Sequence, residues 1–148
     1  MSKCENLLFI TTHKDHEITR QINDLVGKPF SFWTSLKLKG IGSKRMIIED
    51  TSPNFDSILN QVSDLNYANI ELRPQGILVH ITKGLNRFVW VIPYFKLSIY
   101  KTNGLSIHAN GSFIRFRKSK TFNENRAFFN KLLNLKLEFT KRYNFNIN

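Results

Sequence analysis

The sequence contains little cysteine and no long apolar run. Its single cysteine, Cys4, cannot form an intramolecular disulfide, so nothing indicates an oxidising compartment, and we expect a cytoplasmic protein. The longest apolar run, "FVWVIPYF", is far shorter than the roughly 20 residues that span a bilayer. The stretch "LLFI" near the start is too short for a secretory signal. These absences predict a soluble protein with no transmembrane segment.

The chain also lacks the compact motifs of common enzymes. It has no nucleophile elbow, no phosphate-cradling glycine loop, no Cys/His set and no dinucleotide-binding fingerprint. His13 and His16 lie three residues apart beside Asp15, but no third convergent ligand accompanies them, and polar residues at a helix start explain them. We therefore expect no catalytic residues, no metal site, no cofactor and no enzymatic activity.

Acidic residues are scarce in the second half of the chain. Up to Thr82 there are nine basic and nine acidic residues, whereas thirteen basic and two acidic residues follow it, so the whole net charge of +11 lies after Thr82. Clustered positive charge favours an anionic partner, such as nucleic acid, an anionic membrane surface or an acidic protein. Basic residues that merely solvate the surface would give the same count, and both interpretations stay open.

The first half of the chain mixes helical and strand patterns. At 148 residues one domain is expected. "DHEITRQINDLVG" predicts a helix that Asp15 caps and Gly27 ends. "FSFWTSLKLKG" and "KRMIIED" predict two strands joined by a glycine turn. Pro53, which follows the potential N-cap Ser52, begins a predicted helix over 53–64.

From Ala68 onward the hydrophobic period is mostly two. This pattern predicts about six short antiparallel strands, with hairpin turns at two Asn-Gly pairs, Asn103-Gly104 and Asn110-Gly111. In the last strand, "SFIRFRK", strict alternation places Ile114 and Phe116 inward and leaves one outward set. That outward set consists of Phe113, Arg115 and Arg117. A long helix follows, with an apolar stripe formed by Phe128, Leu132, Leu135 and Phe139.

The predicted fold is α+β: a bent antiparallel sheet or partly open barrel of seven to eight strands, capped by a C-terminal helix, with two helices in the N-terminal half. The run "FVWVIPYFKLSIYKTNGLSIHANGSFIRFRK" and the helix after it resemble, in element order, the bacterial type of the pleckstrin-homology-like (PH-like) superfamily. The resemblance implies a PH-like barrel over 30–141 with an inserted helix near 53–64. Residues 1–29 would be a strand-helix elaboration of a single domain, 1–148.

The resemblance also implies candidate ligand contacts. Lipid-binding members of this superfamily use basic residues in their first hairpin, and the comparable segment "LKLKGIGSKRMII" offers Lys39, Lys44 and Arg45. Lys44 and Arg45 are adjacent here rather than one residue apart, and adjacent strand residues face opposite sides, so they could not clamp one phosphate together.

A second potential surface lies on the last strand. "SFIRF" is similar to the end of an RNA-recognition motif, in which Phe113 would stack on a base, but the spacing to the companion segment "LLFIT" does not fit that family. We therefore expect a non-catalytic binding module whose partner is a protein or peptide. Polyanion binding by the basic C-terminal half, to nucleic acid or anionic lipid, is the alternative. The candidate contacts are Lys39, Lys44, Arg45, Phe113, Arg115 and Arg117. The oligomeric state is not predicted.

Overall fold

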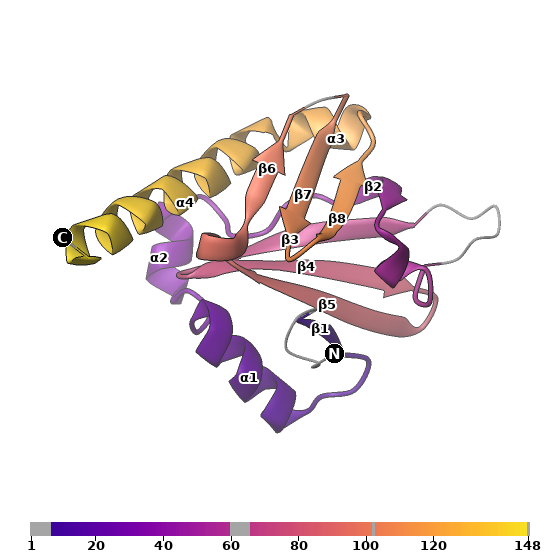
Figure 1. Cartoon of the computed structure of the whole chain (residues 1–148), viewed down its shortest axis with the longest axis horizontal. Helices are drawn as coiled ribbons and strands as arrows, with labels where there is room; N and C mark the ends of the chain where they lie inside the picture. Colours follow the sequence, from indigo (N-terminus) through magenta and orange to yellow (C-terminus); the bar gives the residue numbers. More distant parts are fainter. Residues whose placement is uncertain (1–6, 60–65, 102, 148) are drawn as a thin grey trace.

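The computed structural model describes residues 7–59, 66–101 and 103–147, with side chains up to residue 142 (Figure 1). Within this part of the chain, eight antiparallel strands form one open sheet, which four helices accompany in an α+β fold. The elements, in chain order, are β1 (Leu8–Ile10), α1 (His16–Val26), α2 (Phe32–Lys37), β2 (Met46–Thr51), the 3-10 turn η1 (Pro53–Phe55), β3 (Tyr67–Arg73), β4 (Gly76–Lys83), β5 (Asn86–Pro93), the 3-10 turn η2 (Tyr94–Lys96), β6 (Ser98–Tyr100), β7 (Leu105–Ala109), β8 (Ser112–Phe116), α3 (Lys120–Glu124) and α4 (Arg126–Ile147).

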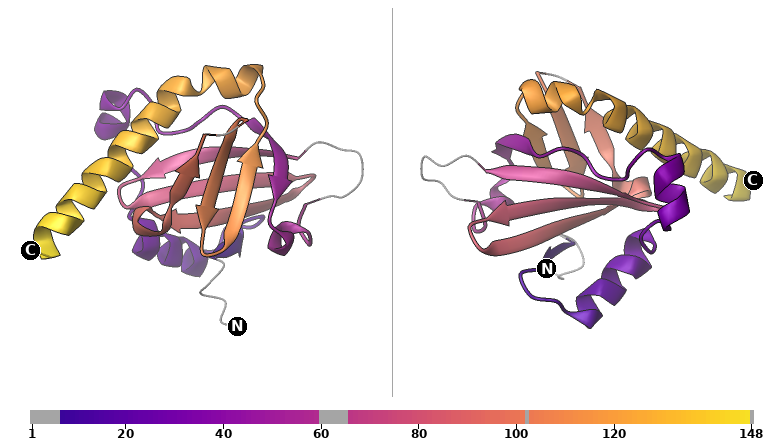
Figure 2. Two further views of the ribbon diagram at one scale, coloured as in Figure 1. Left: turned by 45° about the horizontal axis from the view of Figure 1, so that its top comes forward. Right: turned by 180° about the vertical axis from the view of Figure 1, so that it is seen from behind.

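Strand β2 joins two layers of the sheet. The strand order is β1-β5-β4-β3-β2-β8-β7-β6. Met46 pairs with Ala68 of β3, whereas Ile48 pairs with Phe116 of β8, and the pairing with β8 shifts register between Ile48 and Asp50. Such an irregularity bends a strand, and here the layer formed by β6, β7 and β8 crosses the layer formed by β3, β4 and β5 (Figure 2). The two end strands, β1 and β6, do not pair with each other, so the sheet stays open.

The main core lies between these two layers. Alternate residues of each strand point into it, as the period-two patterns predict. Ile77, Val79 and Ile81 of β4 enter it from one layer. Ile114 and Phe116 of β8, both fully buried, enter it from the other layer, so their predicted inward orientation is confirmed.

Helix α4 covers the open side between the layers (Figures 1 and 2). Its predicted apolar stripe is confirmed: Phe128 and Leu132 are buried in the core, and Leu135 and Phe139 pack against it. The Phe139 ring lies 5.8 Å from that of Tyr94, whose hydroxyl donates a hydrogen bond to the carbonyl of Arg73 at 2.9 Å. Burial raises the pKa of Tyr94, so this phenol stays a hydrogen-bond donor.

Helix α1 covers part of the outer face of β4 and β5. Ile22 and Val26 of α1 form a second core with Leu78, Val89 and Val91 of these strands. The predicted start and end of this helix are confirmed. The Asp15 carboxylate accepts hydrogen bonds from two backbone N–H groups of the first turn, and Gly27 ends the helix with φ of +88°.

The prediction of a strand for "FSFWTSLKLKG" is wrong, because most of this segment forms α2. The Ser31 hydroxyl accepts a hydrogen bond from the N–H of Thr34 at 3.2 Å and so caps a helix start that the period-two pattern obscured. At the other end the N–H of Gly40 donates to the carbonyl of Ser35, and Lys39 and Gly40 have positive φ, which is a common helix stop.

The segment expected to be a helix over 53–64 differs as well. Pro53–Phe55 is a 3-10 turn, and turns continue it to residue 58; residues 60–65 lie outside the described residues. Ser52 does precede the proline, but its hydroxyl accepts from the backbone N–H of Phe113 at 3.0 Å instead of capping a helix. Both Asn-Gly pairs lie in hairpin connections and have positive φ at each residue. Asn110-Gly111 is a two-residue turn of the type I′ kind, because Ala109 pairs with Ser112, whereas the pairing of Tyr100 with Ser106 leaves a longer loop around Asn103-Gly104.

A single side chain fixes the start of α4 to the chain entering β2. Asn125, which is 2% exposed, accepts a hydrogen bond from the N–H of Lys44 at 2.8 Å and donates one to the carbonyl of Lys44 at 3.1 Å. Because one amide satisfies both backbone groups of Lys44, the position of α4 depends on it.

Replacement of this amide tests that dependence. We expect Asn125→Ala to lower the free energy of unfolding by about 1–3 kcal/mol, because two partly buried backbone groups lose their partners. Asn134→Ala, an exposed position on the same helix, is the matched control and should change stability by less than about 0.5 kcal/mol. Urea unfolding followed by circular dichroism measures both, and equal midpoints for the two variants would contradict the role of Asn125.

Candidate functional site

The basic residues predicted on the first hairpin do not converge. Lys44 forms an ion pair with Glu124 at 2.9 Å. Arg45 stacks on the ring of Tyr67, with the guanidinium carbon 4.3 Å from the ring centre. Lys39 lies at the end of α2, where its carbonyl accepts a hydrogen bond from the Lys131 ammonium. Lys44 and Arg45 therefore engage two different neighbours, and Lys39 lies on another element, next to Lys131.

The structure does bring together the outward residues of β8. Phe113 stacks on His108 of β7, with ring centres 5.3 Å apart and an angle of 23° between the planes. His108 in turn makes an edge contact with Tyr100 of β6 at 4.9 Å. Phe113 is half-buried in this row of three rings across neighbouring strands, as close cross-strand pairs allow.

The two arginines beside Phe113 each lie next to a carboxylate. Arg117 forms a hydrogen-bonded ion pair with Glu49, and the Arg115 guanidinium lies 4.0 Å from the carboxylate of Asp50. Both acids belong to β2, which runs next to β8 in the sheet. Because their charges are compensated locally, these arginines offer a weaker attraction to an external anion than their number in the sequence suggests.

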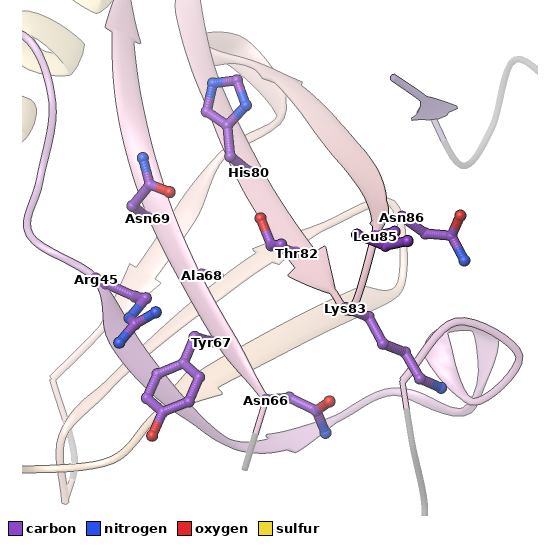
Figure 3. A pocket seen from close by; sticks show the side chains of 11 residues that line it. Arg45, Asn66, Tyr67, Ala68, Asn69, His80, Thr82, Lys83, Leu85 and Asn86 are labelled. Atoms are coloured by element: carbon purple, nitrogen blue, oxygen red, sulfur yellow. The ribbon is translucent and has the colours of Figure 1, made fainter. Parts of the chain in front are cut away.

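A broad polar hollow lies on the outer face of β3 and β4 (Figure 3). It has a volume of about 750 Å³ and extends to the turn between β4 and β5. Its polar lining includes Arg45, Asn66, Tyr67, Asn69, His80, Thr82, Lys83 and Asn86. The stacked Arg45 and Tyr67 lie together on one side of it, whereas Lys83 and Asn86 lie at its other end (Figure 3).

A titratable cluster lies at the edge of this face. Glu71 accepts a hydrogen bond from the Arg73 Nε–H at 2.6 Å and lies 3.1 Å from the His80 ring nitrogen. Burial raises the pKa of Glu71, but the hydrogen bonds with His80 and Arg73 outweigh it, so its pKa is lowered. Arg73 also donates to the side chain of Asn23 and the carbonyl of Gly27. The cluster thus ties the end of α1 to β3.

An apolar groove separates strand β6 from helix α4. It has a volume of about 490 Å³ and an open, shallow form. The strand side is formed by Leu97, Ser98, Ile99 and Tyr100, and the helix side by Leu133, Lys136, Leu137 and Thr140. Leu137 and Tyr100 are 53% and 56% exposed, so the groove leaves large apolar surfaces uncovered.

The edge of β6 that faces away from β7 has no strand beside it within the described chain. The two-residue turn at Asn110-Gly111 makes Ala109 and Ser112 a hydrogen-bonded pair, and such pairs alternate along an antiparallel ladder. In this alternation Ile107 bonds to β8, so its other neighbour, Ile99, is not bonded to β7. The N–H and C=O of Ile99 therefore point to the open edge.

One lysine lines this groove and two others follow its walls in the sequence. Lys136 lines it, and Lys101 and Lys141 lie beyond the ends of its strand and helix walls. Of the two acids that follow Thr82, only Glu138 is on α4. A segment entering the groove would therefore meet an apolar floor and a basic rim.

Compared with known proteins, the chain matches no family model, no curated protein and no solved structure. Among the described residues, no group of three or more His, Cys, Asp or Glu side chains could hold a metal ion. No helix in that part of the chain combines the length and apolar character needed to cross a membrane. The PH-like barrel that the resemblance implies stays a prediction.

The groove residues escaped the sequence analysis for a specific reason. Leu133 and Leu137 lie four residues apart on α4, outside the stripe that begins at Phe128. A helix that packs by one face needs only one apolar stripe. The second apolar pair was therefore the sequence signal for another apolar surface on this helix. Its partner, Ile99, is more than thirty residues away in the sequence, and only the fold brings the two sides together.

The lowered pKa of Glu71 predicts a pH-dependent contribution to stability. A carboxyl whose pKa is depressed by folding stabilises the protein above its unfolded pKa, near 4.5, and loses that effect as the pH falls through its lower folded pKa. We expect Glu71→Gln to be less stable than the wild type at pH 6, and the difference to shrink below pH 4.5. Urea unfolding between pH 7 and pH 3 measures it.

The matched control for this change is Glu138→Gln. Glu138 is exposed on α4 and has no ion-pair partner among the described residues, so its replacement removes the same charge without removing the hydrogen bonds. Parallel pH profiles for the wild type and Glu71→Gln would show that the cluster contributes nothing.

Proposed function

We propose that this protein is a non-catalytic binding module that takes an extended segment of a partner protein into the groove between β6 and α4. The observation that carries the proposal is the open backbone edge at Ile99 beside an apolar groove. An extended peptide that adds a strand to such an edge gains main-chain hydrogen bonds, while alternate side chains enter the adjacent groove. These main-chain hydrogen bonds contribute to binding whatever the partner's side chains are.

The lining of the groove indicates the chemistry of that segment. Ile99 and Leu137 favour apolar side chains in the bound segment. These should occur at every second position of the segment, because successive residues of a strand point to opposite faces. Lys136, which lines the groove, and Lys141, which follows its helix wall, favour acidic residues at the exposed positions and at the ends. The proposed partner is thus an acidic segment with alternating apolar residues, in keeping with the expected resemblance to a superfamily of binding domains.

Polyanion binding through the basic C-terminal half has less support. Arg115 and Arg117 lie beside Asp50 and Glu49. The remaining basic residues are spread along the chain over the β4–β5 turn, the end of β6, the segment after β8 and the length of α4. A duplex or a membrane surface needs a continuous basic face, whereas a short acidic segment needs only the rim of one groove.

A peptide-display selection followed by binding measurements tests the proposal. We expect enriched peptides to alternate apolar residues and to carry acidic residues. Binding should protect the Ile99 N–H from hydrogen exchange and shift backbone resonances of β6 and α4. Leu137→Asp should weaken binding about tenfold or more, because it places a negative charge in the apolar groove opposite an acidic segment.

Leu85→Asp is the matched control, because Leu85 is 94% exposed in the turn between β4 and β5, away from the groove. Fluorescence polarisation with a labelled selected peptide gives both affinities, and circular dichroism confirms that both variants fold. Peptides that bind Leu137→Asp as tightly as the wild type, or a selection that enriches no alternating apolar pattern, would refute the groove as the binding site.

A further inference from the structure

A second, smaller pocket lies where the β6–β7 hairpin, the exit of β8 and the first turn of α4 meet. It has a volume of about 300 Å³, and Leu105 and Phe129, both buried, form its floor. The ring of Phe122 forms part of its wall. Among the described residues, its lining has no residue in common with that of the groove between β6 and α4, so it is a separate site.

Three cations from three different elements line this pocket. Lys101 follows β6, Lys118 follows β8 and Arg126 is the first residue of α4. The other polar side chains of the described lining are the amides of Asn103, Asn123 and Asn130, and this part of the lining contains no carboxylate. Every polar side chain around the pocket can therefore donate hydrogen bonds, which suits a ligand that is rich in acceptors.

These three charges are not compensated within the described part of the chain. No ion pair there joins Lys101, Lys118 or Arg126 to a carboxylate. The nearest acid in the sequence, Glu124, is bound to Lys44 at 2.9 Å, and this contact lowers its pKa. The pocket thus differs from the outer face of β8, where each arginine lies beside an acid.

The formation of the hairpin places Lys101 and Lys118 at one site. Asn103 and Gly104 both have positive φ, and a Cβ at Gly104 would collide with the carbonyl oxygen of Phe116. The turn therefore packs directly against the end of β8, two residues before Lys118. This close approach is possible only for glycine, and it brings together residues that are 17 positions apart in the sequence.

We propose that Lys101, Lys118 and Arg126 form a binding site for a phosphate monoester dianion. An arginine fork, two ammonium groups and amide donors match the acceptor oxygens of a phosphate. A pocket of about 300 Å³ is at the small end of the range for ligand sites, so it accepts one phosphate group with a modest substituent rather than a stretch of polymer. The Phe122 ring offers that substituent an apolar surface.

Three probes that carry the same phosphate test the proposal: inorganic phosphate, AMP and O-phospho-L-tyrosine. We expect each to shift the amide resonances of Lys101, Gly104, Lys118 and Arg126 in two-dimensional NMR titrations. Equal affinities identify the free oxyanion as the ligand, tighter AMP binding identifies a nucleotide, and tighter phosphotyrosine binding identifies a phosphorylated side chain. The absence of shifts with all three probes would overturn the site.

The double variant Lys118→Gln/Arg126→Gln should weaken binding of the tightest probe tenfold or more, since two charge-assisted contacts are lost. Lys28→Gln/Arg87→Gln removes the same charge at exposed positions outside both proposed sites and should leave the affinity within about twofold. Equal losses in both variants would show unspecific attraction and reject the pocket.

The protonation state of the phosphate provides an independent readout. The second pKa of a phosphate monoester is about 6, and no histidine is present among the described residues that line the pocket. We expect the affinity to fall several-fold between pH 7.5 and pH 5.5, as the dianion gains a proton. An affinity that does not change over this range would contradict recognition of the dianion. The Leu137→Asp variant should bind the probes normally, so failure of this site and failure of the peptide groove are distinguishable.

Discussion

Strand β2 is hydrogen-bonded to both layers of the sheet, and the rest of the structure depends on this double pairing. Its first residues, Met46 and Ile47, pair with β3, and the residues from Ile48 onward pair with β8, with a register shift inside the second pairing. A sheet bent in this way encloses a core but leaves one side open and two end strands unpaired with each other. Helix α4 closes the open side, and the groove beside β6 lies where that closure is incomplete.

Helix α4 connects the core to both proposed sites. Its buried side chains, such as Leu132, fill the space between the layers, and Asn125 fixes its start to the chain that enters β2. The phosphate pocket uses its first turn, while the peptide groove uses the segment around Leu137. Because both sites are formed by one packed helix and a strand of the sheet, their geometry is set by the same contacts that stabilise the fold.

The sequence predicts those parts of the fold that depend on local signals. The alternation around Ile114, the Asn-Gly turns and the stripe on α4 each follow from a short pattern, and the structure confirms them. The prediction was wrong at α2, where a single capping hydroxyl on Ser31 outweighs the period-two pattern. The two surface sites could not be predicted, because Ile99 and Leu137, or Lys101 and Arg126, become neighbours only after the sheet has bent.

The double pairing of β2 also has a consequence for synthesis on the ribosome. The hairpins of β3, β4 and β5 pair residues that are close in sequence, whereas the second half of β2 pairs with residues 114–116, more than sixty positions later. Until that part emerges, the edge of β2 is available to other chains. Glu49 and Asp50 place two negative charges on the unpaired edge of β2, and like charges discourage its association with the strand edge of another chain. The same two carboxylates then meet Arg117 and Arg115 when β8 arrives, so they protect the nascent strand before they stabilise the finished sheet.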